Sequence, residues 1–219
     1  MARKMTGTVL SVGKEAEGSK KVVVNLEEPL NFLPGQYCML SFPGREEDKR
    51  AFSIVAQNGN NIMFCIKKSR SFTERLFSST GKNVIVEGPY GRFVLPRDKS
   101  ENIIFIAGGI GITPLYSMIS AALKDEWKGN LALFYSARRK EEMCFFNELS
   151  SLQGENFTAR FFFTRQGSGR VNAEEIFRTC PFANDAIFYI CGPSAMISDM
   201  RSQLLKRGVS DDRIRSEEF

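Results

Sequence analysis

The sequence contains no histidine among its 219 residues, and it has only five cysteines. Without histidine, the chain cannot build a histidine-ligated haem, a histidine-containing metal site or a catalytic triad that uses histidine as its base. The cysteines are widely scattered, with neither a C-x-x-C motif nor the spacing of an iron–sulfur cluster. We therefore expect no bound metal, and any redox chemistry must depend on an organic cofactor.

Long apolar runs and long blocks of one charge are also missing. No apolar run reaches the ~18 residues that cross a bilayer. The basic start of the chain is not followed by the apolar segment of a secretory signal. The net charge is +5, with acidic and basic residues interspersed and no basic–aromatic pattern of nucleic-acid recognition. We expect a cytoplasmic protein without stable membrane insertion and without a nucleic-acid partner.

The first half of the chain consists of short apolar segments separated by glycine, proline and asparagine turns. We expect strands at 6–11, 20–26, 36–42, 51–56, 61–66 and 83–87. One short helix is expected at 73–77. Many short strands joined by such turns are typical of an antiparallel barrel or sandwich.

The second half alternates between apolar strands and helical segments. We expect strands at 103–107, 131–135, 158–163 and 186–191, and helices at 114–124, 141–151, 172–177 and 194–207. This alternation predicts a parallel sheet covered by helices on both faces. A polar segment at 97–100 separates the two halves, so we predict one domain at 1–97 and a second at 98–219.

A glycine-rich turn gives the clearest candidate site. It follows the buried strand at 103–107 and leads into a helix, with Thr113 expected as its cap and Pro114 in its first turn. Gly109 and Gly111 permit a tight turn and let a pyrophosphate approach the backbone, while the helix start offers unpaired N–H groups. The alternative is a plain strand-to-helix turn, but the alternating α/β context favours a dinucleotide site.

Three other segments are weaker candidates. Segment 50–53 places an arginine, an aromatic ring and a hydroxyl on one strand, which suits a phosphate, a planar ring and a ring nitrogen. Segment 69–73 is either a second anion-binding helix start or a simple cap. Cys191 and Gly192 end a strand whose carboxyl end faces the same crevice as the glycine turn. Each segment alone is also compatible with an ordinary structural role.

The order of these motifs carries more information than any one of them. Arg-Ala-Phe-Ser at 50–53, Gly-Pro-Tyr-Gly-Arg-Phe at 88–93, the glycine turn and Cys-Gly-Pro at 191–193 together resemble the ferredoxin–NADP reductase superfamily. The residues of these motifs are most similar to those of the dehydrogenase modules of ferric reductases and NADPH oxidases. The resemblance covers nearly the whole chain. It implies an FAD-binding antiparallel Greek-key β-barrel followed by an NAD(P)-binding, Rossmann-like α/β domain.

The resemblance also implies roles for individual residues. Arg50 would bind the FAD pyrophosphate, Phe52 would pack on the flavin, and Ser53 would hydrogen-bond near its reactive nitrogen. Cys191 would lie beside the nicotinamide, and Phe219 would cover a face of the flavin ring. The other implied cofactor contacts are Ala51, Ser71, Phe72, Thr73, Gly109, Gly111, Ile112, Thr113, Gly192 and Pro193. The chain departs from the usual motif at Phe52, where tyrosine is common, and at Ala56, where serine is common.

Three polar residues after the strand at 131–135 bear on the choice of coenzyme. Ser136, Arg138 and Arg139 lie where the adenosine ribose binds in such domains, and arginine there suits the 2′-phosphate of NADPH. The alternative is a set of solvated charges, which leaves NADH open.

The expected function is that of a flavin-dependent oxidoreductase, which passes hydride from NAD(P)H to bound FAD and electrons to a separate acceptor. The acceptor would be a ferredoxin, a flavodoxin or a small molecule. Two alternatives stay open. One is an NAD(P)H:flavin reductase that uses free flavin as its substrate, and the other is an electron-transfer subunit of a larger complex.

Overall fold

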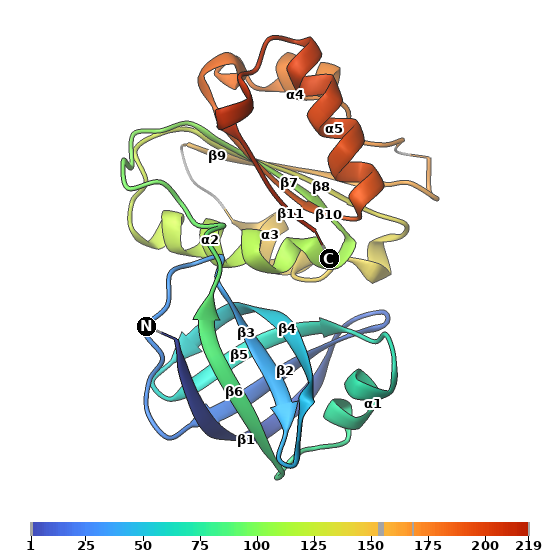
Figure 1. Cartoon of the computed structure of the whole chain (residues 1–219). Coiled ribbons are helices and arrows are strands. Elements are labelled where there is room, and N and C mark those ends of the chain that lie inside the picture. The colour runs from blue at the N-terminus through green and yellow to red at the C-terminus, as the bar shows by residue number, and fades with distance from the viewer. Residues whose placement is uncertain (1, 153–155, 168, 219) are drawn as a thin grey trace.

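The computed structural model describes residues 2–152, 156–167 and 169–218, which form a barrel and an α/β domain packed against each other (Figure 1). The barrel is closed and antiparallel, and its strands are ordered β1-β2-β5-β4-β3-β6. Its elements are β1 (Arg3–Ala16), β2 (Ser19–Leu26), β3 (Tyr37–Phe42), β4 (Arg45–Asn58), β5 (Asn61–Lys67), α1 (Ser71–Phe77) and β6 (Asn83–Tyr90). The barrel predicted from the sequence is confirmed.

Alternation of apolar and polar residues builds the barrel. In β2, Val22, Val24 and Leu26 point inwards and are buried, while the residues between them are partly exposed. The other strands contribute further interior residues, including Leu40 and Phe64, to one apolar cluster. Strand β4 begins earlier than expected. Its first half, 45–50, is charged and lacks the apolar pattern of a strand, and it is extended because it pairs with the end of β3.

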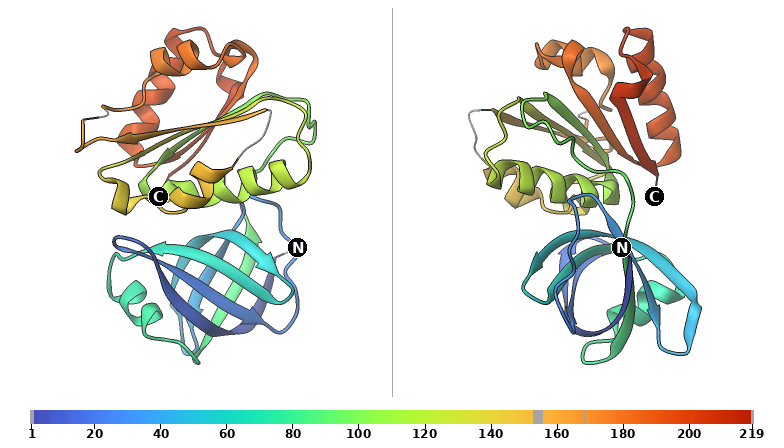
Figure 2. Two further views of the ribbon diagram at one scale, coloured as in Figure 1. Left: turned by 180° about the vertical axis from the view of Figure 1, so that it is seen from behind. Right: turned by 60° about the vertical axis from the view of Figure 1, so that its left-hand side comes forward.

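The α/β domain holds a five-stranded parallel sheet in the order β11-β10-β7-β8-β9. Its strands are β7 (Ile103–Gly108), β8 (Leu131–Ala137), β9 (Phe157–Phe163), β10 (Ile187–Gly192) and β11 (Ile214–Glu218). Helices α2 (Ile112–Lys124) and α3 (Phe146–Ser151) cover the face towards the barrel, and α4 (Ala173–Thr179) and α5 (Ser194–Lys206) cover the other (Figure 2). Short 3-10 turns occur at η1 (Gly109–Gly111), η2 (Lys140–Glu142), η3 (Ala183–Asp185) and η4 (Asp211–Arg213). The predicted parallel sheet is confirmed.

Two parts of this domain differ from the sequence prediction. Strand β11 was not expected, because its mixed sequence Ile-Arg-Ser-Glu-Glu has the burial pattern of a half-exposed edge strand. The helix expected at 141–151 is split into η2 and α3. Phe145, between them, adopts a left-handed backbone conformation with φ of 59°, which a continuous helix cannot contain.

The two domains share one apolar core. Val55, Cys65 and Phe93 from the barrel side belong to the same buried cluster as the α2 face of the sheet, and α2 packs directly on β4. Tyr189, in the middle of β10, donates a hydrogen bond of 2.6 Å to the carbonyl of Val94. Within the described ranges, no helix combines the length and the apolar character that crossing a membrane requires.

Candidate functional site

The parallel sheet has a reversal in its strand order between β7 and β10, and ligands bind beyond the carboxyl ends of strands at such a point. The turn after β7 and the turn after β10 meet there. A Cβ atom added to Gly111 would lie 2.5 Å from the carbonyl carbon of Cys191 and closer still to its oxygen. Gly109, by contrast, has φ of 55° and open space where a Cβ would be. One glycine therefore permits close packing and the other keeps the crevice open.

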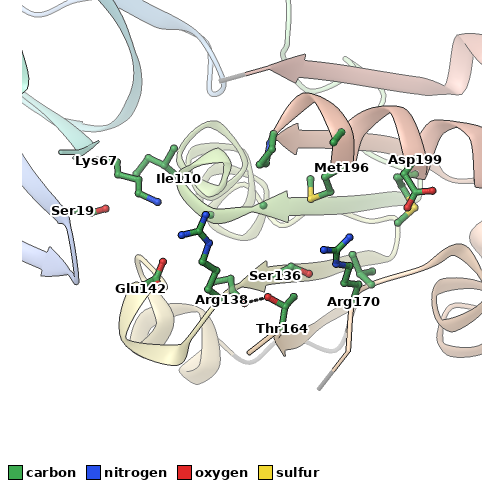
Figure 3. A pocket seen from close by; sticks show the side chains of 17 residues that line it. Ser19, Lys67, Ile110, Ser136, Arg138, Glu142, Thr164, Arg170, Met196 and Asp199 are labelled. Carbon is green, nitrogen blue, oxygen red and sulfur yellow. Dashed lines mark hydrogen bonds between the residues drawn. The ribbon is translucent and has the colours of Figure 1, made fainter. Parts of the chain in front are cut away.

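A cavity of about 420 Å³ opens at this point, which is within the range of small-molecule sites (Figure 3). Both domains contribute to its walls, since Ser19 and Lys67 come from the barrel. The other lining residues are Gly108, Gly109, Ile110, Ser136, Ala137, Arg138, Glu142, Thr164, Arg170, Val171, Pro193, Ala195, Met196, Asp199 and Met200.

Two arginines make one side of the cavity basic. Figure 3 shows Arg138 and Arg170 extending into the same space from neighbouring segments. Neither forms an ion pair with any residue that the structure describes. The Oγ of Ser136, at the end of β8, is buried and has no hydrogen-bond partner in the described part of the chain. A buried hydroxyl and two arginines are donors suited to a phosphate.

Several residues predicted for this site line the cavity, and others do not. Gly109, Ser136, Arg138 and Pro193 are among the lining residues. Arg139 is not, because its guanidinium binds the carboxylates of Glu17, at 2.9 Å, and Glu142, at 3.2 Å.

The helix start itself differs in detail from the expectation. Thr113 was expected to cap α2, and this was wrong. The N-cap position belongs to Gly111, which precedes Ile112, and the Thr113 hydroxyl donates to the carbonyl of Ile110 at 3.0 Å. Ile112 and Thr113 are both buried, and neither lines the cavity.

The segment at 50–53 lies on β4 beside the start of α1. The ring of Phe52 stacks near that of Phe72, with centroids 6.0 Å apart, and the guanidinium of Arg50 lies 6.0 Å from the Phe72 ring. Arg50 also pairs with Asp48 at 2.5 Å and remains half exposed, and Ala51 next to it is exposed.

Ser53 carries the most informative atom of this segment. Its Oγ is buried, and no described residue accepts or donates a hydrogen bond there. A buried hydroxyl without a partner costs free energy, so a ligand atom is the natural partner. An aromatic surface, an arginine and this hydroxyl on adjacent residues fit a flavin with its phosphates.

The start of α1 carries hydroxyl groups on Ser71 and Thr73. Thr73 accepts hydrogen bonds from the backbone N–H groups of Ser69, at 2.9 Å, and Arg70, at 3.3 Å, so its side chain caps the helix. Ser71 is exposed, and Phe72 is buried against the barrel core.

Cys191 is the second-to-last residue of β10 and is fully buried, and burial raises the pKa of its thiol well above the ordinary value. Across the sheet it is in register with Glu217 on β11. Loss of water around Glu217 raises the pKa of its carboxyl to about 7. Gly192, the last residue of the strand, has a φ of 157°, a value that residues with a side chain rarely adopt. Phe219 lies outside the described residues.

Sequence reasoning missed the cavity residues Ser19, Lys67 and Arg170, and it also missed Glu217. Arg170 follows β9 in a loop without a motif, and Ser19 and Lys67 belong to the other domain. Glu217 was missed because its segment has few apolar residues, so strand β11 was not predicted.

Comparisons with known proteins agree with this arrangement. A family model described as an oxidoreductase NAD-binding domain matches residues 105–202. The chain is 28% identical over 217 residues to the ferredoxin–NAD(+) reductase component of the alkene monooxygenase system of Xanthobacter autotrophicus, covering 91% of this chain and 65% of that protein. It is 31% identical over 200 residues to a probable dihydroorotate dehydrogenase B (NAD(+)) electron transfer subunit of Pyrococcus furiosus, covering 86% of this chain and 71% of that protein. The chain thus spans about two thirds of the length of these relatives.

Solved structures show the same fold. The FAD/NAD-binding domain of a nitric oxide dioxygenase from Vibrio cholerae has a TM-score of 0.85 at 22% identity, with 98% of each chain covered. The cytochrome P450 reductase GcoB of Amycolatopsis has a TM-score of 0.84 at 23% identity, covering 100% of this chain and 70% of that one. At these identities the likeness establishes the two-domain architecture.

Proposed function

The chain belongs to the ferredoxin–NADP reductase superfamily, and we propose that it is a flavin-dependent NAD(P)H oxidoreductase that passes electrons to a separate acceptor. The observation that carries the proposal is the cavity at the reversal of the strand order, walled by both domains and lined by Arg138 and Arg170, which form no ion pair with the described residues. A dinucleotide held there would lie between the α/β domain and the barrel. The barrel carries segment 50–53, which we propose binds the flavin.

The barrel residues would hold FAD. FAD, when bound, takes up two electrons together as hydride and releases them one at a time. Arg50 and Ser71 would bind its phosphates, and Phe52 would pack on the ring. The buried hydroxyl of Ser53 would satisfy its missing hydrogen bond at a ring nitrogen. Ala51, Phe72 and Thr73 complete the proposed segment.

The α/β residues would hold the nicotinamide coenzyme. Gly109, Gly111 and the following backbone at Ile112 and Thr113 would cradle the pyrophosphate, since this turn ends in the first N–H groups of α2. The second turn, Cys191-Gly192-Pro193, would lie against the nicotinamide, and Glu217 adjoins it. We retain Phe219 as the proposed cover of the flavin ring.

We propose NADPH as the preferred coenzyme. Ser136 and Arg138 lie at the end of the strand that contacts the adenosine in such domains, and Arg170 extends into the same cavity. A 2′-phosphate would receive charge-assisted hydrogen bonds from both arginines, which a 2′-hydroxyl does not require. Arg139 is a weaker candidate for this contact than Arg138, because its charge is already paired with the carboxylates of Glu17 and Glu142.

We place the boundary between the two proposed domains at residues 97–98. The electron acceptor would be a ferredoxin, a flavodoxin or a small molecule. The names of the relatives, a reductase component and an electron transfer subunit, support a separate acceptor. They also support a place within a larger complex. We propose a cytoplasmic location, where buried cysteines such as these stay reduced.

One experiment tests the flavin role directly. The purified protein should be yellow, and NADPH should bleach its flavin absorbance in a stopped-flow instrument. Ser53→Ala should slow the bleaching about tenfold or more, because it removes a hydrogen-bond partner of the reacting ring, while the melting temperature stays near that of the wild type. Ser41→Ala, another buried barrel serine, is the matched control.

Two results would redirect the assignment. A Ser53→Ala variant that bleaches at the wild-type rate would remove Ser53 from the reaction. A colourless protein that consumes NADPH only when free flavin is added would make it a flavin reductase. The free-flavin result is tested because Phe52 and Ala56 depart from the usual flavin-binding motif.

A second experiment tests the coenzyme preference. Arg138→Ala and Arg170→Ala should each raise the KM for NADPH about tenfold, corresponding to the loss of one charge-assisted hydrogen bond. The KM for NADH should change little. Arg139→Ala is the control, because its guanidinium is committed to Glu17 and Glu142. Equal losses for NADPH and NADH, or an effect only in Arg139→Ala, would contradict the preference.

A further inference from the structure

A buried tyrosine hydroxyl contacts the glycine turn from inside the protein. Tyr135 lies near the end of β8, one position before Ser136, and none of its surface is exposed. Its side chain belongs to the apolar cluster that the two domains share. Its hydroxyl donates a hydrogen bond to the carbonyl of Gly109 at 3.1 Å. Gly109 lines the cavity and Tyr135 does not, so the hydroxyl reaches the turn from the buried side.

The carbonyl of Gly109 has no acceptor capacity left. It accepts the hydroxyl of Tyr135 and also the backbone N–H of Ile112, at the start of α2. A carbonyl oxygen has two lone pairs, so these two donors occupy both. The backbone of Gly109 has φ of 55°, a conformation that glycine enters and leaves easily. The hydrogen bond from Tyr135 therefore favours the one orientation in which this carbonyl points into the protein.

That orientation decides what the turn offers to an anion. A carbonyl oxygen carries a partial negative charge, whereas the backbone N–H groups at a helix start attract phosphate. With its oxygen held inside, Gly109 places no lone pair against a phosphate in the cavity. A turn free to rotate this peptide would lose that property without any change in its sequence.

A second hydrogen bond fixes the direction of the hydroxyl itself. The N–H of Cys144 donates to the Tyr135 hydroxyl oxygen at 3.1 Å. The hydroxyl proton must then point elsewhere, and the carbonyl of Gly109 receives it. The next N–H along the chain, that of Phe145, donates to the carboxylate of Glu15 in the barrel at 2.7 Å. The segment that orients the hydroxyl is thus itself held by the other domain.

We infer that Tyr135 is a positioning residue for the coenzyme, because its hydroxyl keeps the glycine turn in the shape that accepts a pyrophosphate. This role rests on the proposed function, which places a nicotinamide dinucleotide in the cavity. It differs from the role of Arg138 and Arg170, which contact the 2′-phosphate of NADPH. The pyrophosphate is common to both coenzymes, so Tyr135 acts equally on the binding of each.

The test compares Tyr135→Phe with the wild type in full-length protein. This substitution removes the hydroxyl and keeps the ring in the core. The dissociation constants for NADP⁺ and for NAD⁺, measured by titration calorimetry, should both rise about fivefold to tenfold, as expected for one lost hydrogen bond. Their ratio should not change. The affinity for adenosine 2′-monophosphate, which has no pyrophosphate, should stay near the wild-type value.

Turnover separates positioning from catalysis. With ferricyanide as the electron acceptor, the KM for NADPH and the KM for NADH should rise by similar factors in Tyr135→Phe. The kcat at saturating coenzyme should remain near the wild-type value, because the hydroxyl supports binding and does not touch the reacting atoms.

Two further proteins control for the loss of a buried hydroxyl. Tyr189→Phe removes another fully buried hydroxyl from the same sheet, one that donates to the carbonyl of Val94 instead of the glycine turn. It should lower the melting temperature and leave both dissociation constants unchanged. Para-aminophenylalanine in place of Tyr135 retains a donor for Gly109 and should keep the affinity of the wild type. This second protein is informative even if Tyr135→Phe does not fold.

The possible results distinguish this role from the proposed function. Four results would overturn the role of Tyr135 and leave the function in place. They are wild-type affinity in Tyr135→Phe, weaker binding of NADP⁺ alone, an equal loss in Tyr189→Phe, and weak binding by the para-aminophenylalanine protein. A wild-type protein that binds neither NADP⁺ nor NAD⁺ would overturn the proposed function and the role of Tyr135 with it.

Discussion

Glu217 is a carboxyl group held in an environment that disfavours its charge. Removal of water raises its folded-state pKa from 4.5 to about 7. Because the folded state binds the proton more tightly than the unfolded state, this group favours folding at low pH. The contribution is lost as the pH rises from about 4.5 through about 7.

Glu217→Gln should therefore remove a pH dependence. The melting temperature of the variant, relative to that of the wild type, should rise between pH 5 and pH 8, where the wild-type carboxyl becomes charged. Glu218→Gln, one residue along and exposed, is the control that removes the same formal charge. Parallel curves for the wild type and Glu217→Gln would show that this carboxyl titrates normally.

Individual site residues were predictable where their chemistry is local. Gly109 and Gly111 belong to a turn with its own sequence pattern, and Arg138 directly follows a recognisable strand. Arg170 and Glu217 depend on the fold, because a loop and an unpredicted edge strand bring them to the site. Nothing in their own sequence neighbourhood distinguishes them from ordinary surface charges.

The turn between β7 and α2 shows how closely two elements are packed at the site. A side chain at Gly111 would run into the backbone of Cys191, and backbone cannot move aside without shifting β10. Gly111→Ala should therefore destabilise the protein by about 1–3 kcal/mol. It should also weaken coenzyme binding, since it separates the two turns of the crevice.

Urea denaturation measures this effect. Gly13→Ala in β1 is the matched control, because a Cβ there meets no atom within 4 Å and the backbone has no positive φ. The free energy of unfolding should fall in Gly111→Ala and stay near the wild-type value in Gly13→Ala. Equal values for the two variants would mean that the contact between the turns relaxes without cost.

Elements with a strong apolar pattern were predictable, and those defined by their partners were not. Strands β7 and β10 are fully buried and appear in the sequence as continuous apolar runs. The first half of β4 and the whole of β11 are charged or mixed, and they become strands because a neighbouring strand supplies hydrogen bonds. Their existence is a tertiary property, which local sequence does not carry.

At the scale of the whole molecule, the order of the motifs predicted the two domains, but not how they join. The interface combines the shared apolar core with a buried carboxylate, Glu15, whose side chain is 7% exposed. This carboxylate binds Lys21 within the barrel and the N–H of Phe145 in the other domain. Such a contact couples the unfolding of the two domains.

Glu15→Ala should weaken that coupling. It leaves the N–H of Phe145 without its partner at a part-buried position, at a cost of about 1–3 kcal/mol. In calorimetry, we expect a lower melting temperature and a single transition that broadens or splits as the barrel and the α/β domain unfold separately. Glu17→Ala removes an exposed ion pair with Arg139 across the same interface, and should cost at most about 1 kcal/mol. Equal effects of the two substitutions would place the coupling in the apolar core and not in the buried carboxylate.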